Sequence, residues 1–243
     1  MGLTQDGASD HRPRPITIML WAIRAWLAFL VGYSFAVQPV FTSKFLLASS
    51  ALLGLGVSAG FALIPTRRPS ALQKAEAIVL ASFILHVMGH AFGLYARFTY
   101  YDKLLHFVVP AGVVYALFAL SQATRWIWSW SKVRPIEVAV YLCSIMVTIT
   151  VAWEIFEFTT DTFFGTSEQG GQFGANFDTM TDLIVGLAGA VVGSSIAAGI
   201  TAYGHHHGLG TITEAHEHLM RRWGRRAFAR RLEARRWLPR RPP

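Results

Sequence analysis

The sequence predicts an all-α integral membrane protein, a bundle of six transmembrane helices, and three observations support that prediction. Hydrophobic residues make up 53% of the 243 residues and charged residues only 15%, whereas soluble domains usually carry about 25% charged residues. Six apolar stretches approach the roughly 20 residues that cross a bilayer core as a helix. Basic residues concentrate in alternate segments between those stretches. This composition argues against a soluble globular enzyme.

The first three expected spans are Ile16–Val37, Phe45–Ile64 and Ala75–Ala96. The first is longer than the apolar core of about 7–15 residues in a cleaved signal peptide, so we expect it to remain as a membrane anchor. Pro65 follows the second span and indicates a loop there. We interpret Glu76 as a carboxylate in the first turn of the third span, where it interacts favourably with the helix dipole.

The last three expected spans are Leu104–Ser121, Ile136–Phe158 and Leu183–Tyr203. Pro135 precedes the fifth span, at a helix N-terminus, where proline is tolerated. The sixth span contains small residues three and four positions apart, most of them on one face suited to close helix packing in lipid. These residues are Gly186, Gly189, Ala190, Gly193, Ser194 and Ala197. The single cysteine, Cys143, excludes a disulfide framework and a cysteine zinc ribbon.

The distribution of basic residues predicts the orientation in the membrane, because Lys and Arg are enriched in cytoplasmic loops. If the N-terminus is cytoplasmic, the cytoplasmic segments hold Arg12, Arg14, Arg67, Arg68, Lys74, Arg125, Lys132, Arg134 and an arginine-rich tail. The opposite loops hold only Lys44, Arg97 and Lys103. We therefore expect a cytoplasmic segment 1–15, a membrane domain 16–203 and a cytoplasmic basic tail 204–243, in the cytoplasmic (inner) membrane of a bacterium or archaeon.

The tail carries ten of the 22 basic residues as arginines between Arg221 and Arg241, in a chain of net charge +8. Anionic lipids attract a polybasic segment that follows a membrane span, so membrane lipid is the expected partner. Leu219, Trp223 and Phe228 interleave with the arginines, which is typical of a basic helix on the cytoplasmic leaflet. We expect no specific nucleic-acid partner, and the oligomeric state does not follow from the sequence.

Ionisable residues in and beside the expected spans form a pattern. Such residues are costly at membrane depth and usually face the interior of the bundle. A spacing of three or four residues places each set on one face of its helix. The sets are His86 and His90; Asp102 and His106; Glu154, Glu157 and Asp161; and Asp178 and Asp182. With alternating helix directions and a rise of about 1.5 Å per residue, all four sets lie at a similar depth near the outer leaflet.

This arrangement predicts a site that binds a metal ion. Several carboxylates cannot all stay ionised in a low-dielectric site unless a cation neutralises them. Histidine and carboxylate ligands from facing helices suit zinc, manganese or iron(II), so we expect one or two divalent metal ions. The candidate ligands are His106, Glu154, Asp182, Asp178, His90, His86 and Asp161, of which the first three are favoured. Glu157 and Asp102 are the candidate catalytic acids, and one of them would act as a general base.

Other interpretations of these residues stay open. A single membrane histidine such as His86 is more often a packing residue hydrogen-bonded across helices than a ligand. The acids also suit a path for protons or cations, and Arg24 suits a structural salt bridge. The glycine-rich connection Thr162–Phe177 is either a lid over an outward-facing cavity or a mobile connector. Gly56-Val57-Ser58-Ala59-Gly60 matches the nucleophile-elbow pattern, but it lies within an expected helix rather than at a strand-to-helix turn.

Three motifs resemble those of the YjdF-like bacterial inner-membrane proteins. Tyr101-Asp102-Lys103-Leu104-Leu105-His106-Phe107 resembles their Asp-x-x-x-His-Phe segment, and Trp153-Glu154-Ile155-Phe156-Glu157-Phe158 resembles their Glu-x-x-Glu segment. Phe177-Asp178-Thr179-Met180-Thr181-Asp182 is similar to their Asp-Thr-x-x-Asp segment, which a glycine-rich helix follows. The resemblance covers about residues 78–195 and implies a multi-pass membrane fold in which these motifs matter, but it implies no reaction. A looser likeness is to the VanZ-like proteins.

The sequence supports three functions of different classes. The first is a metal-assisted hydrolase or transferase that acts on a lipid-borne or amphipathic substrate. The second is transport of a proton, a cation or a small solute through the acids, although no inverted repeat is visible. The third is a structural or partner-binding scaffold in the membrane.

Overall fold

The fold is known from a computed structural model, which describes residues 15–37, 41–64, 69–124, 133–169, 174–209, 218–219 and 221–222. Apart from Pro15, the expected cytoplasmic segment 1–15 lies outside the described residues, and so does most of the expected basic tail 204–243. The described part of the chain contains seven helices and no strand.

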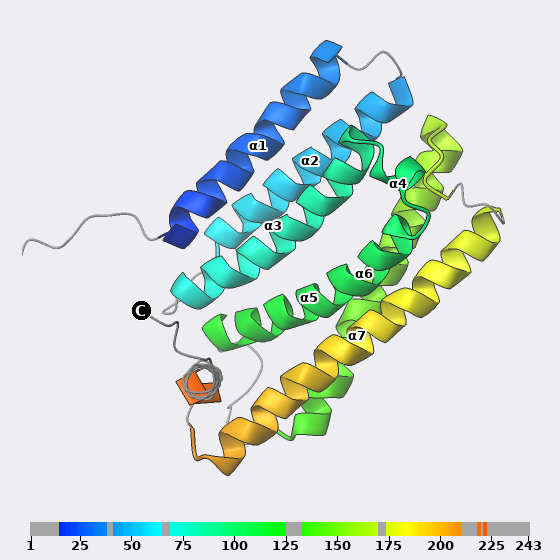
Figure 1. The fold of residues 1–243 in the computed structure, drawn as a ribbon. Helices are drawn as coiled ribbons and strands as arrows, with labels where there is room; N and C mark the ends of the chain where they lie inside the picture. Colours follow the sequence, from blue (N-terminus) through cyan, green and yellow to red (C-terminus); the bar gives the residue numbers. More distant parts are fainter. Residues whose placement is uncertain are drawn as a thin grey trace, which may run out of the picture.

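The helices form a bundle of alternating direction (Figure 1). In chain order they are α1 (Pro15–Val37), α2 (Phe41–Ala62), α3 (Pro69–Ala91), α4 (Leu94–Arg97), α5 (Tyr101–Thr124), α6 (Pro135–Phe164) and α7 (Ala175–His206). α1, α2 and α3 pack together, α5, α6 and α7 pack together, and α3 joins the two groups by packing against α5. The start of α1 and the end of α7 lie at the same end of the bundle.

Five helices in the described ranges are long and apolar enough to cross a membrane. These spans are Pro15–Ser34, Ala71–Ala91, Tyr101–Ser121, Pro135–Phe164 and Ala175–His206. The remaining long helix, α2, is apolar over the shorter stretch Leu46–Ala62. The all-α architecture predicted from the sequence is confirmed, and five candidate spans stand where the sequence predicts six.

α6 and α7 extend beyond the apolar runs that predict their bounds. α6 continues past the expected end at Phe158 to Phe164, and α7 begins at Ala175 instead of Leu183. A polar face turned to the bundle interior does not end a helix. α6 stops only where Gly165 adopts a positive φ of 65°, which glycine tolerates better than other residues. The helix extensions carry several of the predicted site residues.

The α1–α3 group contains a buried ion pair. Arg24 on α1 pairs with Glu76 on α3. Ser58 on α2 donates a 2.5 Å hydrogen bond to Glu76 and accepts one of 2.8 Å from Arg24 Nε. The salt bridge expected for Arg24 is confirmed, but Glu76 does not lie in a first helical turn, because α3 already begins at Pro69. Ser58 lies inside α2, so it does not form a nucleophile elbow.

Glycines on α7 let its backbone approach α5 closely. A Cβ atom at Gly189 would lie 2.2 Å from the carbonyl oxygen of Phe107, and one at Gly193 would lie 2.7 Å from that of Ala111. The close packing predicted for the small residues of the last span is therefore confirmed. This packing brings His106 on α5 beside the N-terminal half of α7.

Candidate functional site

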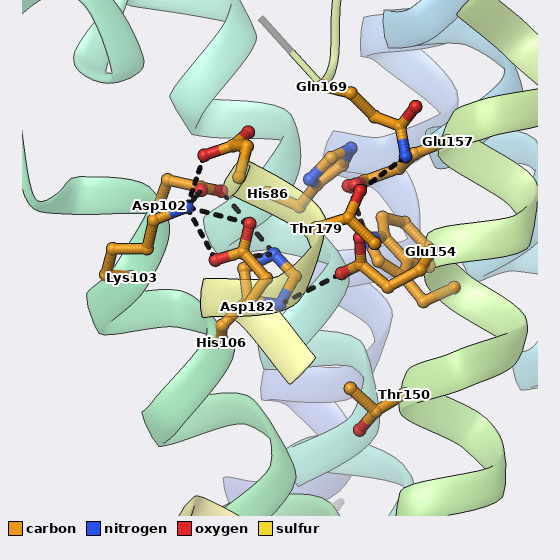
Figure 2. A network of polar contacts seen from close by, with 12 residues as sticks. His86, Asp102, Lys103, His106, Thr150, Glu154, Glu157, Gln169, Thr179 and Asp182 are labelled. Carbon is orange, nitrogen blue, oxygen red and sulfur yellow. Dashed lines mark hydrogen bonds and ion pairs between the residues drawn. The ribbon is translucent and has the colours of Figure 1, made fainter. Parts of the chain in front are cut away.

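Ionisable side chains from α3, α5, α6 and α7 gather at one end of the bundle (Figure 2). Because neighbouring helices run in opposite directions, the C-terminal ends of α3 and α6 meet the N-terminal ends of α5 and α7 there (Figure 1). This is the end of the bundle away from the start of α1. The similar depth that the sequence predicts for the four sets of residues therefore agrees with the fold.

A single lysine faces the three aspartates at the start of α5 and α7. Lys103 Nζ lies 2.9 Å from a carboxylate oxygen of Asp102, 2.5 Å from one of Asp178 and 2.7 Å from one of Asp182. The side chains of Lys103 and Asp102 are 24% and 32% exposed, whereas that of Asp182 is 2% exposed. The ion pairs thus run from the margin of the site into its interior and tie α5 to α7.

His106 lies between these aspartates and α6. Its Nε2 atom is 3.5 Å from Asp102 Oδ1 and 3.9 Å from Asp182 Oδ1. Its Nδ1 atom is 3.6 Å from Glu154 Oε1, a contact that Figure 2 shows. All three distances exceed the usual range of about 2.7–3.2 Å for an N–H···O hydrogen bond. The imidazole is therefore surrounded by carboxylates that lie slightly too far away for ordinary hydrogen bonds.

Two glutamates one helical turn apart on α6 complete this part of the site. Glu154 is 4% exposed, and neither of its carboxylate oxygens has a hydrogen-bond partner of good geometry in the described part of the protein. Glu157 is 7% exposed and accepts a 2.6 Å hydrogen bond from Trp153 Nε1. Burial of an unpaired carboxylate costs on the order of several kcal/mol. The Glu154 carboxylate therefore has the His106 imidazole at 3.6 Å and the Thr179 hydroxyl beside it, but no lysine or arginine among its described contacts.

A second cluster joins α3 to the segment after α6. His86 and His90 lie one turn apart, with ring centroids separated by 4.7 Å. His90 Nε2 is 3.1 Å from Glu168 Oε2, and the Tyr95 hydroxyl is 2.8 Å from His86 Nδ1. The His86 ring also meets the Trp153 ring edge to face at 5.0 Å. Trp153 thus contacts both His86 of this cluster and Glu157 of α6.

Asp161, in the last turn of α6, contacts the connector that follows and belongs to neither cluster. Its carboxylate accepts hydrogen bonds from the backbone N–H groups of Glu168 and Gln169, at 2.8 and 2.9 Å, and from the Thr166 hydroxyl. Gln169 Nε2 in turn donates to the Thr179 hydroxyl of α7 at 2.7 Å. Both oxygens of Asp161 are engaged in folding residues 165–169 back, so its position gives no support to the ligand role predicted from the sequence.

Three groups of side chains bring possible metal-ligand atoms within 4.8 Å of one another. The groups are Asp102, His106 and Asp182; His106, Glu154 and Glu157; and His86, His90 and Glu168. The Lys103 ammonium already contacts both aspartates of the first group, and its charge opposes a metal ion there. The described contacts place no lysine or arginine against the second or third group, so a divalent cation fits best at these two.

Two residues of these clusters, Lys103 and Glu168, are not predicted from the sequence as site residues. The apolar run starts at Leu104, which places Lys103 in a loop, whereas α5 already begins at Tyr101. The excess of acids over cations in the predicted cluster is a signal that a neighbouring lysine belongs to it. Glu168 reaches His90 through the fold of the connector, and no local spacing in the sequence relates these two residues.

The chain is similar to known proteins over most of its described length. An uncharacterized protein of Thermotoga maritima is 31% identical over 119 residues, which cover 48% of this chain and 58% of that relative. The chain therefore spans just over half the length of this relative. No solved structure matches. The family model described as "Predicted membrane protein (DUF2238)" matches residues 18–202, which include all of the clusters above, and the chain belongs to this family of membrane proteins.

Proposed function

We propose that this membrane protein holds a divalent cation between His106, Glu154 and Glu157 and uses it for hydrolysis or group transfer on a lipid-borne or amphipathic substrate. The observation that carries the proposal is the buried carboxylate of Glu154, which faces His106 and has no hydrogen-bond partner of good geometry among the described residues. An unpaired buried carboxylate destabilises the fold, and a bound cation removes that cost.

The spacing of the ligand atoms supports a metal ion. In a tetrahedral zinc site with ligands about 2.1 Å from the ion, neighbouring ligand atoms are about 3.4 Å apart. His106 Nδ1 and Glu154 Oε1 are 3.6 Å apart, which is close to that value and too long for a hydrogen bond. With Glu157 as the third ligand, a fourth position is left for water. Zinc, manganese and iron(II) all suit such ligands, and the ion would supply a Lewis acid and an activated water.

Asp102 and Asp182, which Lys103 binds, lie beside the other ring nitrogen of the imidazole. With Nδ1 of His106 toward the proposed ion, Nε2 faces Asp102 at 3.5 Å and Asp182 at 3.9 Å. Metal-bound histidines commonly direct their second ring nitrogen to a carboxylate, which fixes the ring and makes it a better ligand. This assignment gives Asp102 and Asp182 a positioning role, and it makes Glu157 a ligand where the sequence suggests a catalytic acid.

The site opens at one end of the bundle and is closed below. Side-chain exposure falls from 32% for Asp102 to 10% for His106 and 5% for Glu154. Below these residues the core between α5, α6 and α7 is mainly apolar, although it also buries the hydroxyls of Thr150, Ser194 and Thr201. Its buried members include Val114, Phe118, Val138, Leu142, Met146, Ala190, Ala197 and Ile200. This arrangement favours catalysis over transport, because the described part of α5, α6 and α7 buries hydroxyls below Glu154 but no further acid or histidine that could pass an ion to the opposite end.

The proposal includes the membrane topology. We assign α2 as a sixth span and place both termini in the cytoplasm, because the helices alternate and the basic residues concentrate on the side of Pro15 and His206. The site then lies near the outer leaflet. Aromatic side chains are exposed on the helix ends and turns at that end, namely those of Phe98, Tyr100, Phe163 and Phe177. Such aromatic rings suit the membrane interface, which favours a lipid-borne substrate.

Metal binding to the purified, chelator-stripped protein tests the proposal. We expect calorimetric titration with zinc or manganese to reveal a site that Glu154→Gln weakens by about 100-fold or more, at or above the upper end of the loss caused by removing an outer partner. Glu137→Gln on the same helix is the matched control, because Glu137 is exposed and lies at the opposite end of α6. Unchanged affinity in the Glu154→Gln variant would remove the proposed site.

Chelator-sensitive hydrolysis of a fluorogenic phospholipid in proteoliposomes tests the reaction class. The alternative of transport predicts a different result: a cation or proton flux that Glu154→Gln suppresses and that needs no bound metal. The scaffold alternative predicts that the variant alters assembly but neither metal content nor flux.

A further inference from the structure

We propose that His86, His90 and Glu168 form a second divalent-cation site, selective for zinc, that fastens the connector after α6 to α3. This site is separate from the one formed by His106, Glu154 and Glu157, and it does not depend on that site being correct.

The side chains already converge. The possible ligand atoms of His86, His90 and Glu168 lie within 4.8 Å of one another. His90 Nε2 is 3.1 Å from Glu168 Oε2, yet this buried nitrogen makes no hydrogen bond of good geometry in the described part of the chain. Two possible ligand atoms that lie close together without a hydrogen bond are placed as they would be around a shared cation. A pair of histidines with one glutamate is a ligand set that zinc favours.

The surroundings of His86 support a ligand role. The Tyr95 hydroxyl lies 2.8 Å from Nδ1, which leaves Nε2 to bind the ion, and the Trp153 ring fixes the imidazole from another side. Glycine at position 89 lets the Tyr95 ring pack close to α3, because a Cβ atom at Gly89 would lie 2.2 Å from that ring.

The backbone brings Tyr95 and Glu168 to the histidines by two turns. Gly93 adopts a positive φ of 63°, which ends α3 before the Ala96 expected from the sequence and folds α4 back over it. In the last turn of α6, Asp161 accepts hydrogen bonds from the backbone N–H groups of Glu168 and Gln169, which follow the helix. Glu168 is thereby held against His90, so an ion bound there would tie the connector to α3.

Zinc stoichiometry on the full-length chain, purified without a histidine tag, tests this site. We expect His90→Ala and Glu168→Gln each to bind one zinc ion fewer than the wild type, whereas Glu154→Gln keeps the ion that these two variants lose. His206→Ala is the matched control for zinc bound by the exposed histidines at 205–207, and Glu137→Gln is the control for charge removal. Equal zinc content in wild type, His90→Ala and Glu168→Gln overturns the second site, whatever happens at Glu154.

Amide hydrogen exchange supplies a readout that depends on the connector. Zinc is expected to slow exchange of the Glu168 and Gln169 N–H groups by at least tenfold in the wild type and not in Glu168→Gln. If His90→Ala does not fold, Glu168→Gln decides, since it keeps the shape of the side chain. Exchange that is insensitive to zinc in the wild type would overturn the proposed fastening of the connector.

Discussion

Two ionic clusters in the described part of the chain, the Arg24–Glu76 pair and the cluster around Lys103 and Glu154, differ in how completely their charges are paired. In the α1–α3 group, one arginine meets one glutamate, and Ser58 hydrogen-bonds to both Arg24 and Glu76. In the α5–α7 group, Lys103 faces three aspartates, while Glu154 remains buried without a hydrogen-bond partner of good geometry among the described residues. The proposed metal site therefore rests not on a buried charge alone but on a buried acid that has no lysine or arginine among its described contacts.

The largest effect should follow from removing Lys103, the cation shared by Asp102, Asp178 and Asp182. Lys103→Met leaves three aspartates facing one another, and breaking buried ion pairs typically costs about 3–5 kcal/mol. Thermal unfolding in detergent should show this loss, and millimolar magnesium or calcium should restore part of it by replacing the ammonium. A variant as stable as the wild type, with no response to divalent cations, would show that Lys103 does not balance these acids.

Breaking the Arg24–Glu76 ion pair should destabilise the fold without changing metal binding. Arg24→Met leaves Glu76 buried and unpaired, and we expect a loss approaching 3–5 kcal/mol in the same unfolding measurement. The double variant Arg24→Met, Glu76→Leu should recover most of that stability, because an apolar pair of similar volume often replaces a buried ion pair without loss. Zinc affinity should stay at the wild-type value in both. A loss of zinc in the double variant would contradict the independence of the Arg24–Glu76 ion pair from the proposed metal sites.

A smaller loss of stability is expected from disturbing the close packing of α5 against α7, which supports the cluster around Lys103 and His106. Gly189→Ala places a methyl group against the carbonyl oxygen of Phe107, which must force α5 and α7 apart at a cost of about 1–3 kcal/mol. Gly199→Ala on the same helix is the control, because a Cβ atom there has no neighbour within 4 Å. Unfolding measurements on the pair should separate close packing from helix propensity, and equal stabilities would refute the close approach.

The smallest effect should come from the connector. Asp161→Asn weakens the hydrogen bonds that hold Glu168 and Gln169, so zinc affinity at His90 and Glu168 should fall by about 10-fold, the range seen when an outer partner of a ligand is lost. The affinity of the site at Glu154 should not change. Titration of each metal site in the background of the other site's variant separates the two affinities. A larger loss of affinity at the Glu154 site would show that Asp161 supports that site and not the one at His90 and Glu168.

The helical pattern predicts much of this structure from the sequence. Apolar runs locate the helices, and the spacing of four between Asp102 and His106, or of three between Glu154 and Glu157, predicts their shared faces. Helical spacing cannot predict which cation meets which acid, because Lys103 and Asp182 are distant in the sequence and meet only through the close packing of α5 and α7. The role of Asp161 escapes for a similar reason: the direction of its side chain depends on how the connector folds after Gly165.

We propose that the buried Glu154 binds a divalent cation, and locating the ion tests this proposal most directly. Anomalous scattering at the zinc absorption edge, from crystals of the wild type grown with zinc, should give a peak between His106 Nδ1 and the carboxylates of Glu154 and Glu157. The peak should be missing from crystals of Glu154→Gln. Wild-type crystals saturated with zinc that show no anomalous density at His106 and Glu154 would contradict the account.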